Sequence, residues 1–263
     1  MKRVLHISDL HFGRIHPPAI EALENFLAAQ QQKLDLIVMT GDWTQRARKG
    51  QYQAAAEFIK RSPFPVLTIP GNHDIPLYNF VARLVQPLRN YNRFIRSVTT
   101  DTFEDPEMVI VGFRTASVFR PVEGRVLKKD IERAEKVFSN APDSALRVIA
   151  CHHPLFQPKD LARIQPEYLA NRVLALKPHL VLSGHSHLNW VATVKDEEGH
   201  QILHISAGSA TSDRLRGEVN SFHIITTENA GVNIETYFLS EEGFVIPKGE
   251  VHKSVRWEPF INL

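Results

Sequence analysis

The sequence predicts an α/β protein, and three observations support this class. Short β-branched or leucine-rich runs alternate with longer segments of helical spacing through residue 183. Four further short runs then follow at hairpin spacing. Aspartate, histidine, asparagine and glycine gather directly after most of the predicted strands, which is where an α/β sheet places its functional site.

Each predicted element rests on its apolar spacing and on the turn residues that bound it. The strands predicted in the first part of the chain cover residues 4–8, 36–40, 66–70, 109–113, 148–150 and 180–183. The predicted helices cover residues 17–32, 51–61, 77–96, 128–139 and 161–176. Pro17 and Pro18 suit a first helical turn, and Pro87 divides the 77–96 segment into two helices.

The remaining chain predicts strands at 190–195, 201–206, 221–226 and 232–238, and its last twenty residues lack clear periodicity. No linker, low-complexity tract or internal repeat divides the sequence. We therefore expect residues 1–263 to form a single domain in which both halves share one core.

Composition excludes several classes of protein. With 43% hydrophobic and 23% charged residues, the chain is not collagen-like, disordered or coiled-coil. No apolar stretch is long enough for a membrane helix, and His6 and Asp9 interrupt the N-terminus too early for a signal peptide, so we expect a cytoplasmic protein. The near balance of 31 basic and 29 acidic residues gives no basic groove, and no nucleic-acid partner is expected.

The chain is rich in histidine and poor in cysteine, with 13 histidines and the single Cys151. A lone cysteine forms no internal disulfide and excludes a four-cysteine zinc site. Its strand position favours a small buried apolar side chain. Any bound metal must therefore be held by histidine and carboxylate.

Five polar clusters follow predicted strands. They are Asp9-Leu10-His11, Gly41-Asp42, Gly71-Asn72-His73-Asp74, Cys151-His152-His153-Pro154 and Gly184-His185-Ser186-His187. Three of the four intervals between successive clusters are about 30 residues, the length of one strand–helix–strand unit. We therefore expect the clusters to converge on one edge of one sheet.

The charge of such a cleft indicates its ligand. Asp9 and Asp42 contribute two negative charges, so two divalent cations leave the site at about +2, or about +1 with a bound hydroxide. An electropositive cleft of this kind suits a phosphate ester. Imidazole, carboxylate and amide ligands without thiolate favour Mn, Fe, Zn, Co or Ni over Ca or Mg.

These five motifs, in this order, resemble the calcineurin-like metallophosphoesterase family, in particular its bacterial cyclic-nucleotide-phosphodiesterase-like branch. The resemblance covers roughly residues 3–210. It implies a four-layer α/β/β/α sandwich of two mixed sheets flanked by helices, with the site at the strand ends. It also implies a metal-dependent phosphohydrolase that acts on phosphodiesters or phosphomonoesters.

Carried over by position, the resemblance implies two metal ions, with Mn, Fe or Zn as the leading candidates. Asp9, His11 and His187 would hold one ion, Asn72, His152 and His185 the other, and Asp42 would bridge them. A hydroxide between the ions would attack phosphorus in line with the leaving group.

The resemblance further implies that His73 faces the substrate, where it stabilises the transition state or protonates the leaving group. Asp74 is expected to orient His73 by accepting a hydrogen bond. Arg114 and Arg214 are candidate substrate contacts, since both lie near the predicted cleft. Residues 206–211 and 214–218 could also form dimer contacts, and a structural turn is the equal alternative. The role of His153 is open, and the seven histidines outside the motifs are expected to be structural.

Residues 77–100 carry four arginines and no acidic residue, interleaved with aromatic residues. They could form a basic lid over the cleft that attracts an anionic substrate or a lipid surface, whereas a solvated helix face with aromatics packed inward is the favoured reading.

Two other functions are weighed against a small phosphate-ester substrate. One is hydrolysis of a phospholipid or a nucleotide-sugar pyrophosphate at the membrane surface, which the 77–100 segment suggests. The other is a non-catalytic scaffold with this fold, which the intact ligand set opposes. The oligomeric state does not follow from the sequence, and a homodimer is compatible with it.

Overall fold

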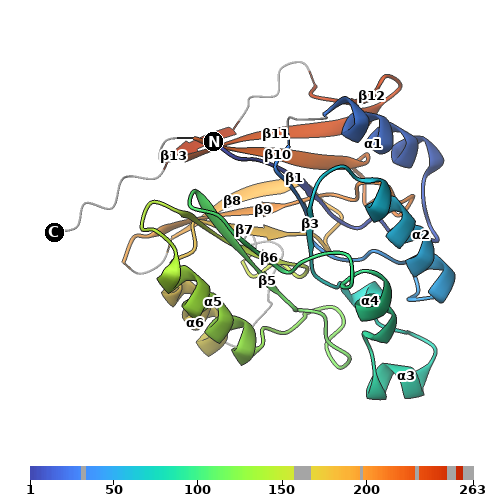
Figure 1. Cartoon of the computed structure of the whole chain (residues 1–263), viewed down its shortest axis with the longest axis horizontal. Coiled ribbons are helices and arrows are strands. Elements are labelled where there is room, and N and C mark those ends of the chain that lie inside the picture. The colour runs from blue at the N-terminus through green and yellow to red at the C-terminus, as the bar shows by residue number, and fades with distance from the viewer. Residues whose placement is uncertain (31–33, 157–166, 196–197, 229–230, 248–252, 257–263) are drawn as a thin grey trace.

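Two mixed β-sheets packed face to face form the centre of the computed structural model, and helices cover their outer surfaces (Figure 1). The structure describes residues 1–30, 34–156, 167–195, 198–228, 231–247 and 253–256. The predicted α/β class and the four-layer α/β/β/α sandwich are confirmed.

The first sheet joins strands from both ends of the chain. Its order is β12-β11-β10-β1-β2-β3, and β13 also pairs with β11. The parallel part consists of β1 (Arg3–Ile7), β2 (Leu36–Met39) and β3 (Val66–Thr68), and the antiparallel part of β10 (Ser221–Glu228), β11 (Gly231–Ser240), β12 (Gly243–Val245) and β13 (Lys253–Arg256).

The second sheet comes from the middle of the chain, in the order β4-β5-β6-β7-β9-β8. Its strands are β4 (Thr102–Glu104), β5 (Met108–Phe113), β6 (Leu146–Cys151), β7 (Leu180–Ser183), β8 (Trp190–Lys195) and β9 (Gln201–Ser206). The four strands β5, β6, β7 and β9 run parallel, whereas β4 and β8 are antiparallel edges.

The strands β1, β2, β3, β5, β6 and β7 are mostly apolar because both faces of each sheet are covered there. In β2, Leu36 and Val38 point into the core between the sheets, and Ile37 and Met39 point toward α1 (Pro17–Ala29) and α2 (Lys49–Arg61). On the other side, α5 (Lys128–Asn140) and α6 (Glu167–Ala175) pack on the second sheet. None of the described helices is both long and apolar enough to cross a membrane.

The 77–96 segment forms two short helices, as Pro87 predicts: α3 (Phe80–Val85) and α4 (Arg89–Phe94). Residues 72–74 form one turn of 3₁₀ helix, and the strands β4, β12 and β13 were not predicted. The predicted start of the 161–176 helix lies outside the described residues, and its described part is α6.

The prediction that all five clusters meet on one edge of one sheet is wrong. The first three follow β1, β2 and β3 of the first sheet, and the last two follow β6 and β7 of the second. The long interval between Asn72 and His152 is the segment in which the chain crosses from one sheet to the other. Regular spacing identified the strand–helix–strand units but did not reveal this change of sheet.

A buried carboxylate, Asp101, joins the segment after α4, the residue after β5, and α5. Asp101 accepts ion-pair contacts from Arg96 at 3.0 Å, Arg114 at 3.1 Å and Arg133 at 3.1 Å. Burial by itself raises the pKa of Asp101, but the three guanidiniums outweigh it and hold the pKa below its usual value. The cluster therefore stabilises the folded state only while Asp101 is ionised.

We expect Asp101→Asn to lower the free energy of unfolding by about 2 kcal/mol at pH 7, because it leaves three guanidiniums without their carboxylate. The pKa of Asp101 is lower in the folded state than in the unfolded state, so this contribution is complete above about pH 4 and is lost as the pH falls further. Urea unfolding at pH 7 and pH 3 measures both effects. The exposed Asp143→Asn is the control, and an equal loss in the two variants would contradict the assignment.

Candidate metal centre

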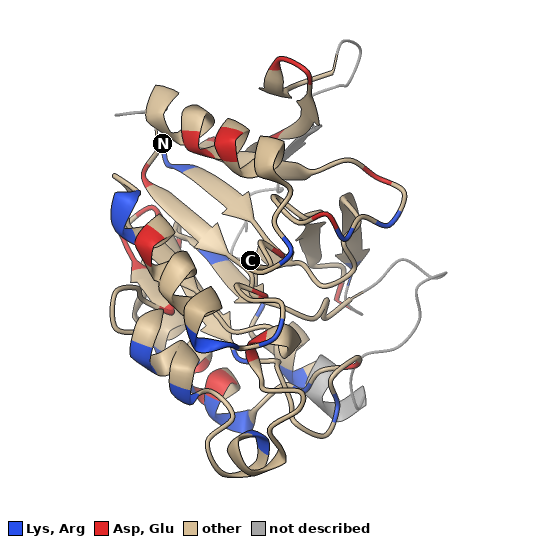
Figure 2. Ribbon diagram, turned by 90° about the vertical axis from the view of Figure 1, so that its right-hand side faces the viewer, with Lys and Arg blue, Asp and Glu red and all other residues tan. Residues whose placement is uncertain are grey.

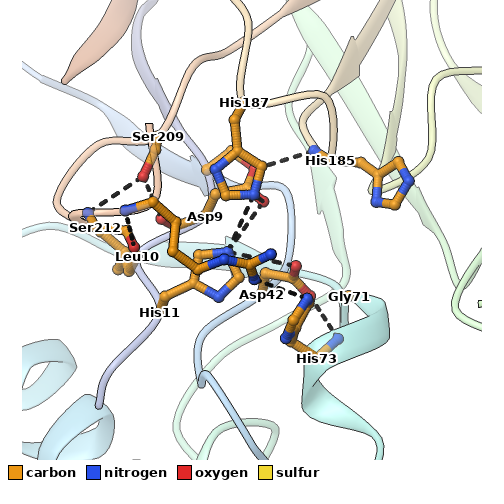
Figure 3. A network of polar contacts seen from close by, with 12 residues as sticks. Asp9, Leu10, His11, Asp42, Gly71, His73, His185, His187, Ser209 and Ser212 are labelled. Carbon is orange, nitrogen blue, oxygen red and sulfur yellow. Dashed lines mark hydrogen bonds and ion pairs between the residues drawn. The ribbon is translucent and has the colours of Figure 1, made fainter. Parts of the chain in front are cut away.

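Five strand-end loops from the two sheets meet at one point, where Figure 3 shows the side chains of Asp9, His11, Asp42 and His187 directed toward one another. Backbone hydrogen bonds hold the loops together. The amide of Asp9 donates to the carbonyl of Gly41 at 3.1 Å, and that of His11 donates to Asp42 at 3.0 Å. The amide of Gly184 donates to the carbonyl of His152 at 3.1 Å and joins the loops of the second sheet in the same way.

The backbone at this point adopts a conformation that side chains disfavour. Five of the seven described non-glycine residues with positive φ belong to the predicted ligand set: Asp9 (54°), His11 (50°), Asp42 (58°), His185 (67°) and His187 (56°). Such left-handed residues cost about 1–3 kcal/mol each and persist only where other interactions impose them. The left-handed backbone at these five residues orients their imidazole and carboxylate groups toward a common centre.

One group of ligand atoms surrounds Asp9. His11 Nε2 lies 3.5 Å from Asp9 Oδ1, and His187 Nε2 lies 3.4 Å from the same oxygen. The two imidazole nitrogens are 3.3 Å apart, and their rings stack with an 11° angle between planes. All three side chains are buried.

A second group surrounds Asn72. His152 Nε2 lies 3.0 Å and His185 Nδ1 3.1 Å from Asn72 Oδ1. Asp42 joins the two groups, because its Oδ2 is 3.4 Å from His152 Nε2 and 3.6 Å from His11 Nε2. The predicted bridging residue thus lies between the two predicted ligand sets.

The residues fit bound cations. Imidazole ligands lie about 2.0–2.1 Å from a metal such as zinc, so neighbouring ligand atoms on one ion are about 3.0–3.5 Å apart. Asp9 Oδ1 is fully buried and has no hydrogen-bond partner. Within the described part of the chain, no lysine or arginine forms an ion pair with Asp9 or Asp42. Two buried carboxylates without such partners favour a bound cation, which would displace the proton that they otherwise hold on His152.

Burial and the two carboxylates act on the imidazoles in opposite directions. Burial alone lowers the pKa of His152, but the Asp42 and Asp9 carboxylates raise it to about 9. Burial and the neighbouring His152 instead lower the pKa of His185 to about 4, which keeps its ring neutral, as metal binding requires.

One oxygen of each of the two carboxylates, Asp9 and Asp42, accepts hydrogen bonds from other groups of the protein. Asp9 Oδ2 accepts hydrogen bonds from Ser8 Oγ at 2.6 Å and from the amide of His185 at 3.0 Å. Asp42 Oδ1 accepts one from the amide of His73 at 2.8 Å. The other oxygen of each carboxylate faces the imidazoles. The hydrogen bonds to the first oxygen fix the orientation of the carboxylate, as they do for metal ligands in general.

Asp74 differs from its prediction. It does not accept a hydrogen bond from the His73 ring but from the backbone amides of Trp43 (3.2 Å), Thr44 (3.0 Å) and Gly71 (3.0 Å). Burial and the nearby Asp42 raise its pKa to about 6. Asp74 therefore clamps the loops that carry Asp42 and Asn72 to each other.

His73 lies beside the ligands, with its ring centre 4.9 Å from that of His11. Its Nδ1 is 2.9 Å from the carbonyl of Gln45, which only accepts hydrogen bonds, so Nδ1 carries the proton. Its Nε2 then accepts a hydrogen bond from Arg214 Nη1 at 3.0 Å. The structure thus brings the candidate substrate contact Arg214 to the centre.

Arg46 was missed by sequence reasoning. Its Nη1 donates to the carbonyl of Gln45 at 3.1 Å and lies 3.4 Å from His73 Nδ1. The available signal was its position four residues after Asp42, in the same loop. Arg46 and Arg214 place two positive charges at His73.

Arg114 and His153 make other contacts. The Arg114 guanidinium forms an ion pair with Asp101. Among the described residues, it makes no contact with His73 or with the predicted ligands. His153 is buried, with its Nδ1 3.0 Å from Thr115 Oγ1 and its Nε2 3.2 Å from the carbonyl of Pro121. Both of its ring nitrogens are therefore occupied, although its ring lies only 4.4 Å from that of His185.

The 206–211 segment holds the first ligand loop. Ser209 Oγ donates to the carbonyl of Asp9 at 2.8 Å, and Thr211 Oγ1 donates to that of Leu10 at 3.0 Å. Ser212 Oγ donates to the carbonyl of Arg14 at 3.1 Å. Of the two alternatives for this segment, the structural one explains these contacts, and Arg214 follows directly after them.

Three of the histidines outside the motifs are buried within the fold. His6 and His223 lie between the sheets, where their rings stack; His6 contacts Thr40, and His223 contacts the carbonyl of Ser206. His204 lies on the outer face of the second sheet, where it contacts Ser183 and packs against Phe156 and Trp190. These contacts agree with a structural role, whereas His252 lies outside the described residues.

Two packed sheets with carboxylate and imidazole groups at their strand ends form a candidate metal centre. The chain belongs to the calcineurin-like phosphoesterase family, whose model matches residues 2–189. The predicted resemblance and the predicted enzyme class, a metallophosphoesterase, are thereby confirmed.

Individual relatives agree with this assignment. The chain is 28% identical over 215 residues to the 3′,5′-cyclic adenosine monophosphate phosphodiesterase CpdA of Escherichia coli strain K12, covering 72% of each chain. It is 28% identical over 207 residues to the glycerophosphodiester phosphodiesterase GpdQ of Enterobacter lignolyticus, covering 69% of each. The purple acid phosphatase PPD1 of yellow lupin shares the fold, with a TM-score of 0.69 and 12% identity; the match covers 96% of this chain but only 53% of that phosphatase.

We expect Gly184→Ala to weaken metal binding by about 10–100-fold, because the new Cβ would lie 1.8 Å from Ser8 Oγ and 2.5 Å from Asp9 Oδ2. Metal titration followed by metal analysis of the dialysed protein measures the loss. Gly50→Ala is the matched control, since nothing lies within 4 Å of its added Cβ. Unchanged metal affinity in a folded Gly184→Ala protein would contradict the role of Asp9.

Proposed function

We propose that the protein hydrolyses phosphodiesters at a centre of two transition-metal ions, with Mn, Fe or Zn as the candidates. Asp9, His11 and His187 hold one ion and Asn72, His152 and His185 the other, with Asp42 shared between them. The observation that carries the proposal is the position of Asp42 Oδ2, which lies within 3.6 Å of an imidazole nitrogen from each group.

When bound, the ions would supply a water-derived nucleophile and would neutralise charge on the phosphoryl group. The protein supplies position and further positive charge. Arg214 extends from the loop that holds Asp9 in place, and its guanidinium lies at His73 Nε2, where it can turn to the phosphoryl oxygens of a substrate. Arg46 adds a second cation on the other side of the His73 ring.

His73 positions Arg214 before substrate binds. Burial lowers the pKa of His73 below its usual value, so the ring is neutral and Nε2 acts as a hydrogen-bond acceptor. When Arg214 turns to the substrate, Nε2 becomes free to exchange a proton with the substrate or with water beside it. Asp74 keeps the loops of Asp42 and Asn72 in register throughout.

The names of the relatives support a diester rather than a monoester. CpdA of Escherichia coli is named for a cyclic nucleotide and GpdQ of Enterobacter lignolyticus for glycerophosphodiesters, and both are phosphodiesters. Cyclic nucleotides are accordingly our first substrate class. A panel of cyclic nucleotides, glycerophosphodiesters and nucleotide-sugar pyrophosphates separates the candidates.

We expect Asp42→Ala to lower metal-dependent hydrolysis of a chromogenic phosphodiester by more than about 100-fold, because it removes the ligand shared by both groups. The rate with a chromogenic monoester, measured in parallel, gives the diester preference. Asp143→Ala, which removes a fully exposed carboxylate, is expected to retain wild-type activity. Wild-type activity of Asp42→Ala would refute the mechanism, and no hydrolysis by the metal-loaded wild type would favour a non-catalytic scaffold.

We expect Arg214→Ala to lower kcat/KM for the diester by about 10–100-fold, since a hydrogen bond to a charged group contributes about 1.5–3 kcal/mol. Metal content should not change, because Arg214 contacts His73 rather than a ligand. The exposed neighbour Arg216→Ala is the control for loss of positive charge. Equal kinetics of the two variants would remove Arg214 from the substrate site.

A further inference from the structure

The short helix α3 leaves its apolar side chains in solvent. Five apolar residues on and just before the helix are each 61–74% exposed: Tyr78, Phe80, Val81, Leu84 and Val85. None of the residues within α3 is buried. Figure 1 shows α3 at the corner of the molecule, away from both sheets. The favoured expectation for this segment, with aromatic residues packed inward, therefore fails at Tyr78 and Phe80, although Tyr91 is buried.

A neighbouring loop extends this apolar surface. Arg83 of α3 donates from Nη2 to the carbonyl of Val118 at 2.7 Å and from Nη1 to that of Pro76 at 3.1 Å, which places the 114–127 loop against the helix. Phe119 and Val122 of that loop are 83% and 67% exposed. These two residues and the five of the helix segment form what we call the α3 patch. Apolar patches of this kind mark interaction surfaces.

The charge around the α3 patch is positive. Residues 77–100 contain Arg83, Arg89, Arg93 and Arg96 and no acidic residue. Arg89 and Arg93 are exposed and line a cavity of about 470 Å³ between α3 and α4, together with apolar groups such as Pro76 and Val85. The face that carries these helices is turned toward the viewer in Figure 2, where lysine and arginine segments are blue. In the adjoining loop, Arg120 is accompanied by the single acidic residue Glu123.

We infer that the α3 patch docks on an anionic lipid bilayer. Exposed aromatic and aliphatic side chains enter the boundary between headgroups and acyl chains, and flanking arginines pair with lipid phosphates. A second copy of the chain fits less well. In a two-fold contact the patch would meet itself and bring Arg89 and Arg93 toward the same arginines of the partner.

This docking surface adjoins the metal centre. Asp74 and Ala47 line the cavity between α3 and α4, and Asn90 Nδ2 of α4 donates to the carbonyl of Ala47 at 3.4 Å. Ala47 directly follows Arg46, which lies at His73. A bilayer on the α3 patch would therefore lie beside the His73 side of the centre, where phosphate esters at a membrane surface come within reach. The inference itself concerns binding and does not depend on the proposed reaction.

Sedimentation with phosphatidylglycerol vesicles at low salt tests the inference. We expect the wild-type protein to bind these vesicles, to bind phosphatidylcholine vesicles much more weakly, and to dissociate from the former as salt is raised. Arg89→Glu/Arg93→Glu should weaken binding by about 30-fold or more, at about 1 kcal/mol for each arginine removed. Phe80→Ser/Leu84→Ser should weaken binding by at least about tenfold, because it removes the inserted side chains.

Lys129→Glu/Lys136→Glu on α5 is the matched control. It makes the same change in net charge at two exposed residues of α5, the helix that covers the second sheet. Binding to the vesicles should stay within about threefold of the wild type. The inference is overturned if the wild type does not sediment with anionic vesicles or if both charge variants lose binding equally. Light scattering without lipid that shows a dimer disrupted by Phe80→Ser/Leu84→Ser would assign the patch to a second copy instead. Circular dichroism and metal content establish that each variant is folded.

Discussion

Two buried carboxylates, Asp9 and Asp42, impose the main energetic constraint on this molecule. Each would cost several kcal/mol to bury without a compensating charge. The left-handed backbone of these two residues and of His11, His185 and His187 adds about 1–3 kcal/mol for each residue. The described residues around them offer imidazole and amide groups but no lysine or arginine ion pair. This arrangement favours bound cations, and the two packed sheets bring the candidate ligand loops together around one point.

The sequence predicted which polar side chains gather at the centre, because the motifs that carry them are local. A strand of apolar residues followed by glycine and a polar ligand is a short-range pattern, as in Gly41-Asp42 or Gly184-His185. The same pattern predicted most of the strands. It did not reveal that β6 and β7 belong to a second sheet. The chain changes sheets within the one long interval, between Asn72 and His152, and an interval that matches no strand–helix–strand unit does not indicate which sheet the next strand joins.

Contacts between distant loops were beyond local patterns. Asp74 lies next to His73 in sequence, yet its carboxylate turns to the amides of Trp43 and Thr44, about 30 residues away. Arg114 pairs with Asp101, a partnership set by how β5 packs beside α4 and α5. Arg46 and Arg214 approach opposite nitrogens of one imidazole from different parts of the chain. Such arrangements depend on tertiary packing, which spacing in the sequence does not determine.

The central claim, that Asp42 is shared by two metal ions, is tested most directly by anomalous diffraction from crystals of the manganese-loaded protein. The account predicts two anomalous peaks about 3.5–4 Å apart, one among Asp9, His11 and His187 and one among Asn72, His152 and His185, each within coordination distance of Asp42. A single peak, or a second peak displaced onto His153 and away from Asp42, would contradict it.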